Sequence, residues 1–168
     1  MNATDLRELQ SPLKRKYRDD PASAATPLRA EGDFSAGGTT ATVKGWAGPV
    51  RAGLHPATGG DGSDACSGDM LLQAVLACAG VTLHSVATSL GIDIRGAELE
   101  AIASFDARGT LGVSREAPVG IQGLVITAHL DVDASDVTLA KLAELTERYC
   151  VVGQSLAEVP RVVVTRAD

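Results

Sequence analysis

The 168-residue sequence is poor in aromatic side chains, in cysteine and in positive charge. With two Phe, one Trp and two Tyr, its core must be filled by Ala, Val, Leu and Ile. Three cysteines are too few for a disulfide scaffold but allow a small number of reactive thiols. Fifteen basic residues against 21 acidic ones give a net charge of −6. That balance weighs against nucleic acid as a partner, because phosphate binding needs clustered positive charge.

The sequence also lacks the features of secreted and membrane proteins. Its N-terminus alternates charged and polar residues and has no apolar segment of the kind found in a secretory signal. The longest uncharged apolar stretch, Met70–Leu83, is too short to span a bilayer. We therefore expect a soluble, cytoplasmic protein with no membrane contact, in which thiols stay reduced.

The sequence does contain enough apolar material for one folded domain, preceded by a charged arm. Hydrophobic residues make up 45 % of the chain, which is typical of folded soluble proteins. Leucines recur at helical spacing within residues 1–20, and a Pro-Ala-Ser-Ala-Ala linker follows. We expect a helical arm and linker over residues 1–25 and a single domain over residues 26–168.

Apolar periodicity predicts an α+β fold in which antiparallel sheets surround a long central helix. Strands are predicted over residues 28–34, 39–46, 50–54, 97–107, 123–133 and 161–166. Helices are predicted over residues 68–90 and 136–149, with a helical turn over 154–158. Because residues 68–90 are apolar on nearly every face, that helix is expected to be buried. No regular strand–helix alternation and no internal repeat is present.

Three cysteines are the first candidates for chemistry. Cys78 lies midway along the predicted central helix, where a free cysteine often only packs, so an inert and a reactive interpretation are both open. Cys150 follows the second long helix, and it could approach Cys78 only if the two helices pack together. Cys66, in the loop before the central helix, has no obvious partner.

The histidines do not indicate a site. His55 lies in a loop, His84 on the central helix and His129 on the polar face of a strand. A Cys78–His84 hydrolase pair is weakened by its spacing, since six residues along a helix separate side chains by about 9 Å and place them on different faces. No CxxC, HxH or HExxH motif is present, so neither a metal nor a cofactor is expected.

Two segments together resemble the OsmC/Ohr family, whose names stand for osmotically inducible protein C and organic hydroperoxide resistance protein. The first is the turn Gly59-Gly-Asp-Gly-Ser63 followed by the Ala-rich helix that carries Cys78. The second is Glu147-Arg-Tyr-Cys-Val-Val-Gly-Gln-Ser-Leu156, which is similar to the family's second cysteine motif. The resemblance runs in the same order over roughly residues 28–164 and leaves only the N-terminal arm outside it.

The resemblance implies an OsmC-like intertwined homodimer and a peroxidase that reduces organic hydroperoxides. It implies that Cys78 is the peroxidatic thiolate, which becomes a sulfenic acid, and that Cys150 is the resolving cysteine. A dithiol such as a protein-bound lipoyl group would then reduce the Cys78–Cys150 disulfide. An arginine that activates the thiolate is also implied, with Arg51 as first candidate and Arg29 as second.

Two positions depart from the family's pattern. Gly68 stands where the family has a glutamate that holds the arginine, and Asp69 is the candidate to replace that carboxylate. Alternatively, Asp69 interacts only with the helix dipole. Val151 stands where a proline follows the second cysteine. These departures keep a second hypothesis open, a dimeric thiol-bearing binding protein of the same fold without catalysis.

Overall fold

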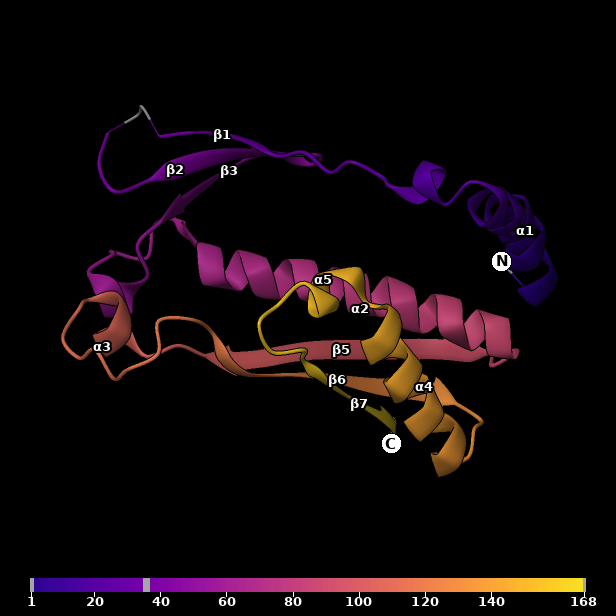
Figure 1. Cartoon of the computed structure of the whole chain (residues 1–168). Coiled ribbons are helices and arrows are strands. Elements are labelled where there is room, and N and C mark those ends of the chain that lie inside the picture. Colours follow the sequence, from indigo (N-terminus) through magenta and orange to yellow (C-terminus); the bar gives the residue numbers. More distant parts are fainter. Residues whose placement is uncertain (1, 35–36, 168) are drawn as a thin grey trace. The chain divides into compact units, whose positions relative to one another are not determined.

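The computed structural model describes residues 2–34 and 37–167 of the chain (Figure 1). Its contacts divide the chain into two compact units, which are treated separately below. Unit 1 comprises residues 1–27, 74–102 and 124–168. Unit 2 comprises residues 28–73 and 103–123.

Unit 1 is built on the three-stranded sheet β5-β6-β7. Its strands are β5 (Ile94–Ser104), β6 (Gln122–Val132) and β7 (Arg161–Arg166), the first two beginning or ending in unit 2. Its helices are α1 (Ala3–Asp19), most of α2 (Ser67–Leu90), α4 (Asp136–Tyr149) and α5 (Val151–Gln154), with the 3₁₀ turn η1 at Pro21–Ala24. Strand β7 runs parallel to β6, with Val162 opposite Ile126.

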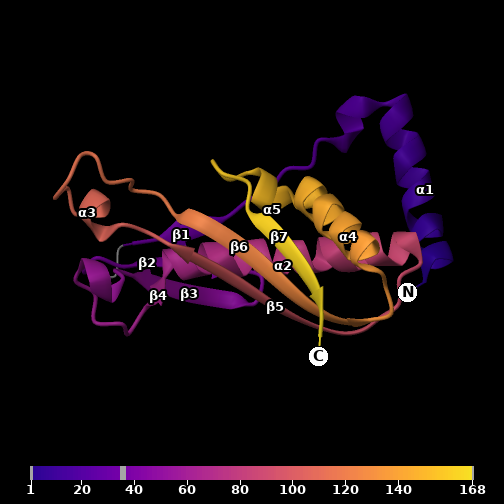
Figure 2. The same ribbon diagram turned by 90° about the horizontal axis from the view of Figure 1, so that it is seen from below.

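One face of β6 carries the core of unit 1. Alternate residues of this strand, from Ile126 to Val132, are buried, whereas His129 and Asp131 on the other face are exposed. Helices α2 and α4 both pack on the buried face, where Leu83 and Leu142 join one apolar cluster with Leu130 (Figure 2). The alternation predicted from the sequence for this strand is confirmed.

Helix α1 forms the predicted helical arm. Asn2 caps its first turn, with Asn2 Oδ1 accepting the N–H of Asp5 at 3.0 Å and Asp5 Oδ2 accepting the N–H of Asn2 at 3.0 Å. This reciprocal pair is a capping box, which satisfies N–H groups that the first turn would otherwise leave free. No described side chain of α1 is buried.

Unit 2 contains the four-stranded sheet β1-β2-β3-β4. Its strands are β1 (Glu31–Asp33), β2 (Ala41–Gly45), β3 (Gly48–Gly53) and β4 (Ala65–Cys66). The 3₁₀ turn η2 (Pro56–Thr58), helix α3 (Ala107–Thr110) and the start of α2, as far as Gln73, complete it. Gly37 and Gly38, which precede β2, both have positive φ, a conformation that favours glycine.

Several details of the sequence-based prediction differ from the structure. Strands β1, β2 and β3 are antiparallel as expected, but β4 joins β3 in parallel and β7 joins β6 in parallel. Strand β5 begins at Ile94 instead of residue 97. Elements β4 and α3 were not predicted, because two and four residues are too few to show a periodicity.

The helical turn predicted over residues 154–158 is wrong, since α5 begins directly after Cys150. The cause is a side-chain cap that periodicity cannot reveal: Cys150 Sγ accepts the N–H of Gly153 at 3.4 Å. Burial of α2 also differs from the expectation. It is confined to one stripe of α2 (Val75, Ala79, Leu83, Val86, Ala87), while Val81 is 71 % exposed.

By length and composition alone, α2 could cross a membrane, and it is the one such helix within the described residues. The core helix of a soluble protein passes the same test. Thr82, His84 and Ser85 interrupt its apolar surface, and its buried stripe packs against the sheet and α4. These observations favour a core helix over a membrane span.

Leu142 on α4 is fully buried in the core of unit 1, so Leu142→Ala should lower the free energy of unfolding by about 2–5 kcal/mol. Val137→Ala on the same helix is the matched control, because Val137 is 81 % exposed, and it should change stability by less than about 0.5 kcal/mol. Urea unfolding followed by circular dichroism measures both changes. Equal losses for the two variants would contradict the assigned packing of α4.

Candidate thiol site

Cys78 and Cys150 lie together in the core of unit 1. Cys78 is half-buried midway along α2, and Cys150 joins α4 to α5 with 2 % of its surface exposed. Both belong to a second apolar cluster that includes Val75, Ile126 and Val162. The two thiols are close enough to hydrogen bond to each other, and both are free. Helices separated by 45 residues of chain thus bring the two predicted redox cysteines together.

Hydrogen bonds on both sides fix the position of Cys150. Its N–H donates to the carbonyl of Thr146 at 3.0 Å, which ends α4. Its carbonyl accepts the N–H of Gln154 at 2.9 Å, which begins α5. Thr146 is itself fully buried, and its hydroxyl donates to the Leu142 carbonyl at 2.7 Å. The resolving thiol predicted from the sequence therefore lies at a rigid corner between two helices.

The chain after Cys150 is tied to α4 and to β7 as well. Glu147 Oε1 accepts the N–H of Val162 at 2.6 Å, and the Glu147 carbonyl accepts the side-chain amide of Gln154 at 2.8 Å. Gly153 packs so closely that a Cβ there would lie 3.3 Å from Cys150 Sγ and 3.3 Å from Pro160 Cγ. A larger residue at position 153 would therefore push against the thiol.

The environments of the two thiols shift their pKa values in opposite directions. Burial raises the pKa of Cys78, but the Val152 N–H, the Cys150 thiol, the Val151 N–H and the Thr82 hydroxyl together bring it below its ordinary value. Burial raises the pKa of Cys150, and although the Gly153 N–H lowers it, hydrogen bonding to Cys78 and repulsion by its charge raise it further. This asymmetry favours Cys78 over Cys150 as the thiol that ionises, with the Cys150 thiol as the donor in their hydrogen bond.

Sequence reasoning missed the groups that stabilise the Cys78 thiolate. Thr82 follows Cys78 by four residues on α2, so helical spacing could have identified it. The N–H groups of Val151 and Val152 could not be found, because the start of α5 was misplaced. Val151 stands where the family has a proline, and a proline would have no N–H to donate to the sulfur of Cys78.

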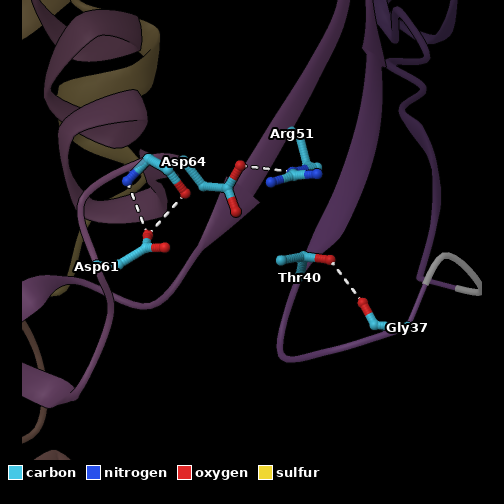
Figure 3. A network of polar contacts seen from close by, with 6 residues as sticks. Gly37, Thr40, Arg51, Asp61 and Asp64 are labelled. Atoms are coloured by element: carbon cyan, nitrogen blue, oxygen red, sulfur yellow. Dashed lines mark hydrogen bonds and ion pairs between the residues drawn. The ribbon is translucent and has the colours of Figure 1, made fainter.

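The arginines predicted to activate the thiolate have other partners in unit 2. Arg51 Nε on β3 donates to Asp64 Oδ1 at 2.5 Å (Figure 3). This hydrogen bond and the Asp64 charge raise the pKa of Arg51. Arg29 forms an ion pair with Glu31 at 2.5 Å, with both side chains at least half exposed.

Neither arginine pairs with Asp69, the proposed replacement for the family's glutamate. Asp69 is exposed in the first turn of α2 and has no ion pair within the part of the chain that the structure describes.

Asp61 Oδ1 accepts the N–H and the hydroxyl of Ser63 at 2.9 and 2.6 Å, which stabilises the Gly-rich turn (Figure 3). Within described unit 1, no guanidinium is among the groups that shift the pKa of Cys78.

The histidines take structural positions. His129 Nδ1 lies 2.8 Å from the Thr165 hydroxyl across the sheet, and His55 Nδ1 accepts the Ala57 N–H at 3.0 Å. His84 is exposed on α2, so the structure does not combine it with Cys78 into a hydrolase pair. Across residues 2–34 and 37–167, no three His, Cys, Asp or Glu side chains gather closely enough to hold a metal ion.

Because its pKa is lowered, Cys78 should be alkylated at a lower pH than Cys150, whose pKa is raised. Removing the hydroxyl in Thr82→Val should move the midpoint for Cys78 upward by about one pH unit, as loss of a hydrogen bond to a charged group predicts. Thr88→Val is the control, because the Thr88 hydroxyl donates to the His84 carbonyl at 2.8 Å. Iodoacetamide labelling against pH, read by peptide mass spectrometry, gives both midpoints. Alkylation of Cys150 at a lower pH than Cys78 would contradict the assignment of the lowered pKa to Cys78.

Solved structures with the same fold come from several bacteria. An organic hydroperoxide resistance protein of Elizabethkingia anophelis has a TM-score of 0.67 at 14 % identity, with 85 % of this chain and 98 % of that chain covered. An OsmC-like protein of unknown function from Vibrio cholerae has a TM-score of 0.66 at 11 % identity, with 85 % and 100 % covered. The organic hydroperoxide resistance protein OsmC of Legionella pneumophila has a TM-score of 0.64 at 15 % identity, with 85 % and 98 % covered. At these identities the likeness concerns the fold.

A comparison of the sequence with curated proteins finds no match. The family profile described as OsmC-like protein matches residues 60–165, well over half of the chain. This match covers both cysteine segments and agrees with the two sheets and long helix of the structure. The chain therefore belongs to the OsmC-like protein family.

Proposed function

We propose that this chain is a thiol-dependent peroxidase that reduces organic hydroperoxides in the cytoplasm. The observation that carries the proposal is the pairing of Cys78 with Cys150, with the pKa of one thiol lowered and that of the other raised. Family membership supports it, as does the likeness to proteins named for organic hydroperoxide resistance.

In the first step the Cys78 thiolate attacks the distal oxygen of the hydroperoxide. A sulfur–oxygen bond forms, the oxygen–oxygen bond breaks, and the leaving alkoxide takes up a proton to become an alcohol. The N–H groups of Val151 and Val152 and the Thr82 hydroxyl hold the attacking sulfur as an anion. Cys78 is then a sulfenic acid.

In the second step Cys150 attacks the sulfur of Cys78. A disulfide forms, and the sulfenic oxygen leaves as water. Two electrons and two protons from an external dithiol, such as a protein-bound lipoyl group, then return both thiols. The close approach of the two cysteines in one cluster supports resolution without a large rearrangement.

The apolar cluster around the thiols supports an organic substrate. Leu76, Leu124, Val152 and Leu156 are partly buried against it, so its accessible surface suits an alkyl group better than hydrogen peroxide. Arg51 remains the arginine proposed to activate Cys78, and Asp69 the carboxylate proposed to hold that arginine. These roles require Arg51 to break its ion pair with Asp64 or to bind both carboxylates. The thiolate-stabilising groups of unit 1 make activation less dependent on that arginine.

One equivalent of cumene hydroperoxide should produce a Cys78–Cys150 disulfide in the purified protein, detected by peptide mass spectrometry. Cys78→Ser should abolish the disulfide and peroxide consumption, whereas Cys150→Ser should leave a trappable sulfenic acid on Cys78. Cys66→Ser is the matched control and should retain the Cys78–Cys150 disulfide and peroxide consumption. If no disulfide forms, or if it forms through Cys66, the peroxidase proposal is wrong and a non-catalytic thiol-bearing binding protein is favoured. Faster consumption of hydrogen peroxide than of cumene hydroperoxide would contradict the organic preference.

We also propose that two copies associate as a homodimer through the exposed face of α2. On this face, Ala74, Ala77 and Val81 are exposed at helical spacing, with Val81 71 % exposed. Apolar side chains on one side of a helix favour burial against a partner. A second copy of α2 would bury them and explain why the helix is apolar on nearly every face.

Val81→Glu should therefore shift the protein from dimer toward monomer, because it places a charge in the proposed contact. Val137→Glu is the control, since Val137 is 81 % exposed on α4, outside the proposed contact. Light scattering after size-exclusion chromatography measures the mass of each variant. A monomeric unmodified protein at micromolar concentration would overturn the dimer proposal.

A further inference from the structure

Unit 2 contains the third cysteine of the chain, Cys66, which the proposed peroxidase reaction does not use. Two adjoining hollows, of about 440 and 320 Å³, share a wall made of His55, Cys66, Gly68, Phe105 and Ile121. Their volumes lie within or near the range of natural small-molecule sites, roughly 300–1,000 Å³. The thiol and an imidazole thus face the same space within one unit.

The position of His55 is fixed by its turn. The His55 carbonyl accepts the N–H of Thr58 at 2.8 Å, the Thr58 hydroxyl at 2.9 Å and the N–H of Gly60 at 3.1 Å. Gly60 lies so close to the chain before His55 that a Cβ there would come within 1.7 Å of the Leu54 carbonyl oxygen. The Gly-rich turn after β3 therefore orients His55 at the cleft.

The tautomer of His55 is also determined. Its Nδ1 accepts the N–H of Ala57 at 3.0 Å, so in the neutral ring the hydrogen is on Nε2. The ring packs edge-to-face against Phe105, with centroids 5.3 Å apart. His55 is therefore a preorganised hydrogen-bond donor beside an apolar wall.

Gly68 makes room for the thiol at the start of α2. A Cβ at position 68 would lie 3.4 Å from Cys66 Sγ and 3.9 Å from Ile121 Cδ1. Because Gly68 lines both hollows, a side chain there would fill the space in front of Cys66.

The lining of the cleft selects a neutral, apolar molecule. Leu54, Leu71 and Val119 extend the apolar surface of the larger hollow. Neither lysine nor arginine is among the residues that line the two hollows, and Asp69 lines the smaller one, so a carboxylate or phosphate finds no cation there. Apart from the Asp69 carboxylate, the polar side chains that line the space are a thiol, the imidazole and hydroxyls, which suit a carbonyl oxygen.

We propose that this cleft binds unbranched α,β-unsaturated aldehydes or ketones and that Cys66 adds to them covalently. In this step Cys66 Sγ forms a bond to the β-carbon, the carbon–carbon π bond breaks, and the thiol proton ends on the α-carbon. No electrons enter or leave. The Nε2–H of His55 donates to the carbonyl oxygen as negative charge develops on it. This reaction does not depend on the proposed peroxidase activity.

The test uses the full chain with Cys78→Ser and Cys150→Ser, which leaves Cys66 as its one cysteine and has no peroxidase pair. Rates of adduct formation with trans-2-nonenal and with acrolein, the same electrophile without a chain, are measured by mass spectrometry. Each rate is divided by that of N-acetylcysteine. The ratio for nonenal should exceed the ratio for acrolein by about tenfold, as expected for desolvating an alkyl chain in an apolar cleft. Equal ratios would overturn the proposal.

Two further variants test the cleft itself. His55→Asn retains an oxygen that can accept the N–H of the turn but removes the Nε2–H. It should lower the rate of adduct formation with both electrophiles by about tenfold or more. His129→Asn in unit 1 is its control and should leave both rates unchanged. Gly68→Leu should slow nonenal more than acrolein, with Val119→Asp as a second variant at the cleft if Gly68→Leu fails to fold. An unchanged rate in His55→Asn, or adducts on histidine and lysine in place of Cys66, would contradict the proposal. Peptide mapping of the wild-type chain, in which Cys66 should carry the nonenal adduct, repeats the test with all thiols present.

Discussion

The packing of α2 and α4 on one face of β6 is the constraint on which the thiol site depends. Leu83, Leu130 and Leu142 anchor this contact, and each is almost fully buried. Because the end of α4 is fixed against the sheet, Cys150 is held beside Cys78 on α2. The closeness of the two thiols is therefore a product of the core of unit 1.

The same contact explains how the pKa of a half-buried thiol is lowered. Desolvation alone would hold Cys78 protonated. The turn from α4 into α5 offsets this by presenting the N–H groups of Val151 and Val152, and Thr82 adds a hydroxyl from α2 itself. Backbone donors of this kind cost no side-chain entropy on ordering, so they form a preorganised environment for the charge. The groups that lower the pKa of Cys78 thus all belong to unit 1.

In unit 2, two glycines allow close approaches of the chain that a larger residue would prevent. Gly60 allows the chain to fold back against Leu54, and Gly68 leaves space beside Cys66. The Gly-rich turn has a structural role, since Asp61 stabilises it and it holds His55 in place. Arg51 is likewise engaged by Asp64 at the edge of this turn. The polar residues of unit 2 thus order a loop, and the space they leave is apolar.

The long helices and strands can be predicted from the amino-acid sequence, because a period of 3.6 or 2 over ten or more residues is a strong signal. The predicted bounds of α4 and β7 are those observed, and α2 begins one residue earlier than expected. The cysteine motifs also indicate the family from the sequence alone. The groups that surround each thiol follow only from the tertiary structure, because Cys78 on α2 is far along the chain from Cys150 and the α5 amides that follow it. The tertiary structure also decided that Arg51 faces Asp64, since charge pairing depends on three-dimensional distance and a sequence records only order.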